Sequence, residues 1–112
     1  MIEWLPRSAF RAEFESEYRP LGRYISEESH LDVSLAELQV RIPVASVHTP
    51  VDDEDFPGPV ERWYGRVAGH LFLLTYYHHP SDRVAILALE PRFEAREAVR
   101  TAVQELLAPR SA

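Results

Sequence analysis

A ten-residue run from His70 to His79 constrains the possible folds of this chain more than any other feature. In an extended conformation its alternate residues form two sets, and both are largely apolar: Phe72, Leu74 and Tyr76 in one, and Leu71, Leu73, Thr75 and Tyr77 in the other. A strand that is apolar on both faces is normally an interior strand, covered on each side. A buried helix is the alternative, but the aromatic residues in the run and the turn residues at its ends favour a strand.

The residues on either side of this run predict two more strands. Arg62 to Val67 alternates, and the link Val67-Ala68-Gly69-His70 is short and holds a glycine that can adopt a positive φ, which suits a hairpin. Pro80-Ser81-Asp82 has the residues of a turn, and Val84 to Leu89 consists mostly of small and β-branched residues. The sequence therefore predicts an antiparallel three-strand meander from Trp63 to Leu89.

An amphipathic helix is predicted after the meander. It begins near Pro91 or Arg92, because proline is tolerated in the first helical turn, and Pro109 is expected to end it. Its apolar residues recur every three or four positions and form one stripe: Ala95, Ala98, Val99, Ala102, Val103 and Leu106. We expect this stripe to lie across one face of the meander, which would explain why the central strand needs two apolar faces.

The start of the chain predicts a short strand and a first helix. Met1 to Leu5 is the strand, and Ser8 is a candidate N-cap for a helix from about Ala9 to Tyr18. An aromatic stripe at i, i+4 spacing on this helix is expected to belong to the core: Phe10, Phe14 and Tyr18.

The segment after the first helix is ambiguous. Its polar beginning could form a short helix capped by Ser26 or Ser29. Leu31 to Ile42 is either two strand pieces joined by a bulge, or a helix around Ser34 to Gln39 that leads into a strand. We expect Val40 to His48 to be extended, with its proline confining it to a sheet edge or a break.

Length and composition bound the class of protein. With 112 residues, 46% of them hydrophobic and 27% charged, the chain has the make-up of one globular domain. We therefore expect a single α+β domain over residues 1–112: an antiparallel β-meander sheet with an N-terminal helix and a C-terminal amphipathic helix packed on it. No apolar run approaches the roughly 20 residues of a membrane span, and no signal-peptide pattern is present. We expect a cytoplasmic protein that does not bind membranes.

The residue types exclude several kinds of chemistry. The chain has no cysteine, which excludes disulfides and thiolate metal sites, and no lysine, which excludes Schiff-base chemistry. His78 and His79 would point to opposite faces of a strand, and His70 and His78 would lie about 26 Å apart on one face, so only His48 from elsewhere could complete a metal site. No nucleophile elbow or glycine-rich phosphate loop is present. We expect no metal and no cofactor, and favour a protein that is not an enzyme.

The net charge of −6 is distributed unevenly. Residues 1–60 hold five arginines against twelve acids, whereas residues 61–112 hold seven arginines against six acids. An acidic first half should repel nucleic acid and accommodate a basic protein. Six acids of this half are our candidate partner-binding residues: Asp52, Asp53, Glu54 and Asp55 in a loop, and Glu27 and Glu28 upstream of it.

Two stretches of the chain carry motifs of a known family. The opening Met-Ile-Glu-Trp-Leu-Pro-Arg-Ser-Ala-Phe-Arg looks like a first strand and helix of that family, and Gly69 to Tyr77 followed by Arg83 to Arg92 look like its Gly-Tyr-Arg-x-x-Tyr strand and its last strand ending in arginine. With these stretches, about half of the chain resembles the RelE/ParE superfamily of toxin–antitoxin modules. Leu71 and Ala98 stand where the mRNA-cleaving members have an arginine and a tyrosine. Only Arg92 falls on a functional position.

Two functions are compatible with this sequence. The first is a small acidic immunity or inhibitor protein that neutralises a basic toxin or nuclease by occluding its active site, with charge steering the association. The alternative, which the resemblance implies, is a non-nuclease or degenerate RelE/ParE-like toxin that an antitoxin binds. Four arginines could line one edge of the sheet in that alternative: Arg62, Arg66, Arg83 and Arg92.

Overall fold

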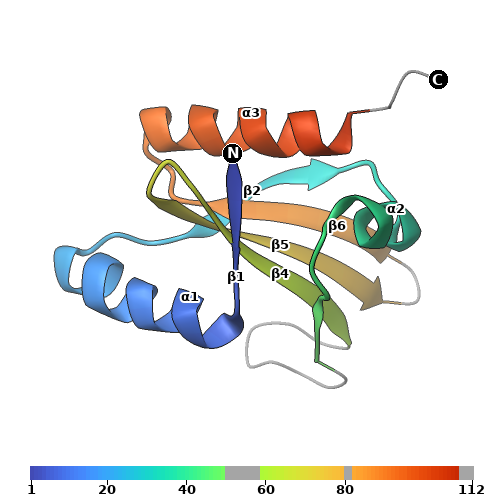
Figure 1. Cartoon of the computed structure of the whole chain (residues 1–112), viewed down its shortest axis with the longest axis horizontal. Helices are drawn as coiled ribbons and strands as arrows, with labels where there is room; N and C mark the ends of the chain where they lie inside the picture. Colours follow the sequence, from blue (N-terminus) through green and yellow to red (C-terminus); the bar gives the residue numbers. More distant parts are fainter. Residues whose placement is uncertain (50–58, 80–81, 109–112) are drawn as a thin grey trace.

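The apolar run of the central stretch forms strand β5 (His70–His79), which lies in the middle of the sheet in the computed structural model of this chain (Figure 1). Strands β4 (Val60–Val67) and β6 (Asp82–Leu89) flank β5 and pair with it in antiparallel register. Ala68 and Gly69 form the hairpin between β4 and β5, at φ values of 49° and 81°. The predicted three-strand meander is therefore confirmed.

Three further strands complete a six-stranded sheet in which every pairing is antiparallel. β1 (Ile2–Leu5) pairs with the second half of β4, and β3 (Val47–Thr49) pairs with its first three residues. β2 (Ser26–Leu31) pairs with β6. The order along the sheet is β1-β4-β5-β6-β2, with β3 beside β4, so that β2 is a terminal strand.

The structure describes residues 1–49, 59–79 and 82–108, without six of the side chains in these ranges: Glu27, Glu28, His79, Asp82, Arg83 and Val84. This part of the chain has the predicted α+β architecture, an antiparallel sheet with an N-terminal and a C-terminal helix packed on it. No helix in these ranges is long and apolar enough to cross a membrane.

Helices cover both faces of the sheet (Figure 1). On one face, α3 (Phe93–Leu107) buries three residues of its predicted stripe: Ala95, Val99 and Val103. On the other face, α1 (Arg7–Glu13) continues into a π-helical segment, η1 (Phe14–Tyr18), and a short 3-10 helix, η2 (Arg19–Leu21). The hydroxyl of the buried Tyr18 accepts a hydrogen bond from a backbone N–H of β5 at 2.7 Å. β5 is thus covered on both faces, as its sequence predicts.

Two details of the first helix differ from the prediction. The helix begins at Arg7 and no side chain caps it, so Ser8 lies inside the first turn and is not the N-cap. Of the aromatic stripe, only Tyr18 is fully buried, whereas Phe10 and Phe14 are partly buried. After α1 the chain continues as a π-helix, whose turn is wider than that of an α-helix. Residues four positions apart therefore no longer lie directly above one another, and i, i+4 spacing does not predict which of them are buried.

The ambiguous segment forms a strand and then a helix. The polar stretch that holds Ser26 and Ser29 is strand β2, so the predicted short helix is wrong; the backbone of this stretch pairs with the edge of β6 instead. For the next stretch the helical alternative is confirmed. α2 (Leu35–Arg41) follows Ser34, whose side-chain oxygen accepts a hydrogen bond from the amide three residues later at 3.2 Å. The extended structure predicted for Val40 to His48 is wrong in its first part, since α2 continues into it and only β3 is a strand.

A row of three residues across β1, β4 and β5 fixes the packing beneath α3. Trp4, Gly65 and Phe72 are register neighbours on these three strands. A Cβ atom at Gly65 would overlap the ring of Phe72, so the glycine makes room for that ring. The ring of Trp4 meets the ring of Phe72 edge-on, with centroids 5.7 Å apart. A glycine within a strand weakens a sheet because it has no side chain to pack. Here the two aromatic rings fill the space above the glycine.

Gly65→Ala should therefore lower the free energy of unfolding by about 1–3 kcal/mol, because the added methyl group forces the buried Phe72 ring out of its position. Urea denaturation of the wild type, Gly65→Ala, Phe72→Leu and the double variant measures this effect. The cost of Gly65→Ala should fall by at least half in the Phe72→Leu background, where the ring is gone. Additive costs would contradict the proposed overlap.

Candidate functional site

Most of the predicted partner-binding acids fall where side chains are not described. The acidic run Asp52–Asp55 lies outside the described residues, in the segment between β3 and β4. Glu27 and Glu28 belong to β2, whose backbone is described, but their side chains are outside the description. Their role in binding stays a prediction.

The four arginines of the toxin-like alternative have different surroundings. Arg62 and Arg66 lie on β4 and point to the face that α1 covers. Arg92 follows β6 and lies beside Glu90. Arg83 belongs to β6, and its side chain is outside the description.

Arg66 and Arg92 are engaged by carboxylates. Arg66 donates from Nε and Nη2 to the two oxygens of Glu3 at 3.1 and 2.6 Å, and it also pairs with Glu13 of α1. The Nε atom of Arg92 lies 3.5 Å from a carboxylate oxygen of Glu90. These contacts join elements of the fold and reduce the positive charge that an anionic ligand would meet.

Glu90 has the most buried charged side chain of the described residues, at 2% exposure. Arg23 donates to both of its oxygens, from Nε at 2.5 Å and from Nη2 at 3.2 Å, and the same guanidinium lies over the ring of Tyr18, 3.9 Å from its centroid. Burial alone would raise the pKa of Glu90, but the hydrogen bonds and charge of Arg23, and then the charge of Arg92, hold this pKa below its ordinary value. The cluster ties the end of β6 to the segment after η2.

Arg23→Ala should lower the free energy of unfolding by about 3 kcal/mol at pH 7, because the buried carboxylate of Glu90 loses its main partner. Arg66→Ala is the matched control. It removes an arginine paired with carboxylates that water can reach, and should cost much less than Arg23→Ala, because solvent-exposed ion pairs contribute little to stability.

The cost of Arg23→Ala should also depend on pH. The pKa of Glu90 lies below its ordinary 4.5 in the folded protein, so the stabilisation is fully present above pH 4.5 and is lost as the pH falls through the folded-state value. Urea denaturation at pH 7 and at pH 3 should show the difference from wild type shrinking at the lower pH. Equal costs for the two variants, or a cost of Arg23→Ala that does not change with pH, would contradict a structural role for this ion pair.

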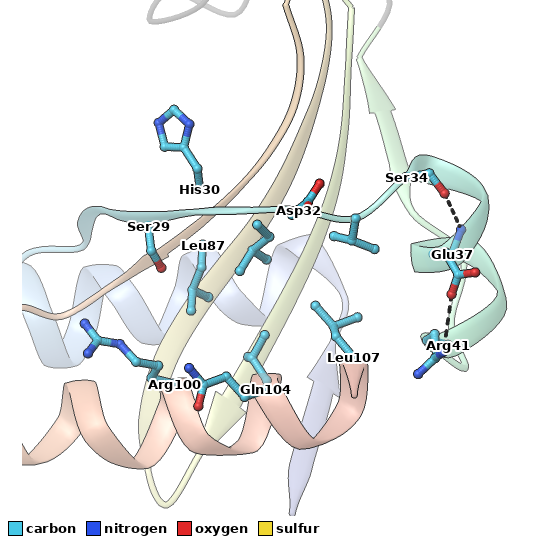
Figure 2. Close-up of a pocket in the computed structure, with 13 residues that line it drawn as sticks. Ser29, His30, Asp32, Ser34, Glu37, Arg41, Leu87, Arg100, Gln104 and Leu107 are labelled. Atoms are coloured by element: carbon cyan, nitrogen blue, oxygen red, sulfur yellow. Dashed lines mark hydrogen bonds and ion pairs between the residues drawn. The ribbon is translucent and has the colours of Figure 1, made fainter. Parts of the chain in front are cut away.

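A groove of about 670 Å³ lies between β2, α2 and α3, on the face of the sheet that α3 covers (Figure 2). Ser29 of β2 points toward Arg100 of α3 across it, whereas His30 points away from it (Figure 2). Pockets of this size accept several side chains of a partner or a small ligand. The apolar part of its lining comes from five residues: Leu31, Val33, Leu87, Val103 and Leu107.

Arg41 of α2 lines the groove, but its charge is used inside the fold. It pairs with Glu37 one turn earlier at 3.3 Å, and it donates hydrogen bonds to the carbonyl oxygens of Leu106, at 3.5 Å, and Ala108. A cation at these carbonyls stabilises the C-terminal end of α3. On the α2 side, the exposed acids Asp32 and Glu37 also line the groove, and Glu37 does so in its pair with Arg41.

Three neighbouring strands bring two histidines and a carboxylate together at a second place. His48 of β3 is directly opposite Glu61 of β4, and His78 of β5 lies two residues beyond Tyr76, the partner of Glu61 on that strand. The Nδ1 atom of His48 and the Nε2 atom of His78 both contact Oε2 of Glu61, the latter at 3.1 Å. The hydroxyl of Ser46 donates to Oε1 at 2.6 Å.

The pKa of Glu61 keeps this residue ionised. Burial alone would raise the pKa, but hydrogen bonds from Ser46, His48 and His78 hold it below its ordinary value. An ionised carboxylate can accept two imidazole N–H groups or ligate a cation. Sequence reasoning compared histidines along one strand and missed Glu61 as their common partner. The usable signal was a glutamate within a strand whose neighbouring strands each carry a histidine.

A smaller hollow of about 310 Å³ lies between α1 and β4. Four arginines line it: Arg7, Arg11, Arg19 and Arg62. Aromatic rings lie among them, with the ring centroids of Phe10 and Tyr64 4.9 Å apart, and Glu15 also lines the hollow. The acidic first half of the chain therefore contributes three arginines to a cationic hollow, which its net charge does not indicate.

Comparison of the chain with models of protein families, with curated proteins and with solved structures finds no match. The resemblance to the RelE/ParE superfamily stays a prediction. The functional interpretation rests on the geometry of the groove, the histidine cluster and the cationic hollow.

Proposed function

We propose that this chain is a small acidic protein-binding domain that neutralises a basic toxin or nuclease by occluding its active site. In this proposal the partner places a basic segment in the groove between β2, α2 and α3. The observation that supports it is the acidic composition of the segment that contributes the β2 side of the groove; Arg41 and Arg100 lie on the α2 and α3 sides. Residues 26–37 hold four acids and no arginine, and two of these acids, Asp32 and Glu37, line the groove.

The lining of the groove suits a basic side chain. Protein interfaces combine a buried apolar centre with a polar rim, and the groove has both. An arginine or lysine of the partner would lay its aliphatic stem on the apolar lining, beside Leu31 and Leu107, and its charged head at the rim. Glu37, whose side chain is 56% exposed, offers a carboxylate there, which Arg41 contacts through one of its oxygens.

The open edge of β2 offers a second means of attachment. Among the described residues, β2 pairs with β6 alone, so the backbone groups of its other edge are available to a strand of the partner. A register shift between Glu27 and Ser29 interrupts the pairing with β6. We therefore expect an added strand to pair along residues 29–31, next to the groove.

The partner is identified by affinity capture from the source cells at low and high salt, and should be a basic protein that elutes with salt. With the purified pair, Glu27→Arg/Glu28→Arg should lower the association rate constant about tenfold or more at low salt, because acids of β2 would steer a basic partner during the encounter. Stopped-flow or surface-binding kinetics measures this rate constant.

The control variant is Glu15→Arg/Glu17→Arg, which changes the net charge equally but lies on η1, on the other face of the sheet. It should keep the association rate constant within about twofold of wild type. Equal slowing by both variants would show that net charge alone matters, and that the acids of β2 only discourage edge-to-edge pairing of this strand.

Reversal of the acidic run, with Asp52, Asp53 and Asp55 changed to arginine, should also slow association, since these acids are among the predicted partner-binding residues. Association rates that stay unchanged at low salt would remove the acidic run from the predicted binding residues.

A RelE/ParE-like toxin, non-nuclease or degenerate, is the second candidate function, and the cationic hollow between α1 and β4 favours it. Induced expression of this chain alone in growing cells separates the two candidates. A toxin would arrest growth, and Arg19→Ala/Arg62→Ala would relieve the arrest. The inhibitor proposal expects normal growth, together with protection of the cells against the basic partner.

A further inference from the structure

The cluster of His48, Glu61 and His78 shares no residue with the groove or with the cationic hollow. We propose that these three side chains bind one divalent transition-metal ion, with zinc as the best fit. This inference does not depend on the protein-binding proposal, because it concerns other strands and another kind of ligand.

The ligand atoms of the cluster already converge. Two imidazole nitrogens and one carboxylate oxygen lie within 4.8 Å of one another. Ligand atoms bound to one tetrahedral zinc ion at about 2.0–2.2 Å lie roughly 3.3–3.5 Å apart. The separation of 3.1 Å between Nε2 of His78 and Oε2 of Glu61 is close to that spacing. Small side-chain rotations would therefore admit an ion where imidazole protons now contact the carboxylate.

The backbone of the sheet holds the three ligands in place. His48 and Glu61 are a register pair of β3 and β4, and such pairs have Cβ atoms about 4.5–5.5 Å apart. The backbone N–H of His78 donates to the carbonyl of Pro59 at 3.1 Å, which extends the pairing of β4 with β5 to the residue before the start of β4. All three ligands therefore come from paired strands, so the ion would enter a largely preformed site.

Two neighbouring side chains orient the ligands. The hydrogen bond from Ser46 occupies Oε1 of Glu61 and leaves Oε2 facing both imidazoles. The ring of Tyr76 meets the ring of His78 edge-on, with centroids 5.1 Å apart. Outer contacts of this kind fix the orientation of ligands in metal sites, and their loss typically lowers metal affinity 10–100-fold.

The ligand set selects the class of ion. Imidazole suits zinc and other late first-row metals, whereas calcium and magnesium take oxygen ligands. Three protein ligands leave the fourth position of a tetrahedral zinc ion open. The side chain of His48 is 53% exposed, so solvent reaches this side of the cluster and a water molecule or small anion could occupy the open position.

Isothermal titration of the metal-free full chain with zinc chloride tests the proposal. We expect one zinc ion per chain with a dissociation constant below about 10 μM, corresponding to a micromolar-range site. His48→Ala and His78→Ala should each weaken binding about 100-fold or more, and Ser46→Ala about tenfold. His30→Ala, which removes an exposed histidine of β2 outside the cluster, should leave zinc binding unchanged.

Circular dichroism of each variant checks that it folds; the two histidine side chains are 53% and 28% exposed, so their removal should not unfold the sheet. A second variant, with Asp52, Asp53 and Asp55 changed to Asn, should retain zinc. The proposal would be overturned if this variant lost zinc binding while His48→Ala bound zinc normally. That result would assign the ion to the acidic run. Binding weaker than 10 μM, or equal binding by wild type and both histidine variants, would also overturn it.

Discussion

The burial of β5 on both faces is the constraint on which the rest of this structure depends. Phe72 and Leu74 face the core beneath α3, while the buried Tyr18 bonds to the backbone of β5 from the other side. One strand can be covered twice only if helical segments reach both faces, and here they come from the two ends of the chain (Figure 1). The places left for binding are therefore peripheral: the terminal strand β2, and the end of the sheet where β3 meets β4.

The sequence predicts the parts of this fold that have a strong local period. The two apolar faces of β5 and the stripe of α3 follow from spacing alone. β2 could not be found in this way, because Ser26 to Leu31 is polar and becomes a strand through pairing with β6, far away in the chain. The same holds for the histidine cluster. His48 and His78 are unremarkable on their own strands, and only the register of three strands brings both to Glu61.

Charge counting along the chain describes the surface only coarsely, since several charges are used inside the fold. Arg23 neutralises the buried Glu90, and Arg41 stabilises the end of α3. Residues 26–37 still hold four acids and no arginine, although one of them, Glu37, pairs with Arg41 at the groove. Conversely, the acidic first half contributes Arg7, Arg11 and Arg19 to the cationic hollow on the α1 side. The two faces of one small domain thus suit partners of opposite charge, and the choice between them is the functional question.

Amide hydrogen exchange of the chain, alone and saturated with its captured partner, shows which surface the partner covers. If a basic segment occupies the groove, amides of β2 and α2 should become protected on binding, with the strongest effect at residues 29–41, while α1 and η1 exchange as before. Protection confined to α1, η1 and the start of β4 would contradict this account. It would place the partner on the cationic hollow and favour the toxin-like function.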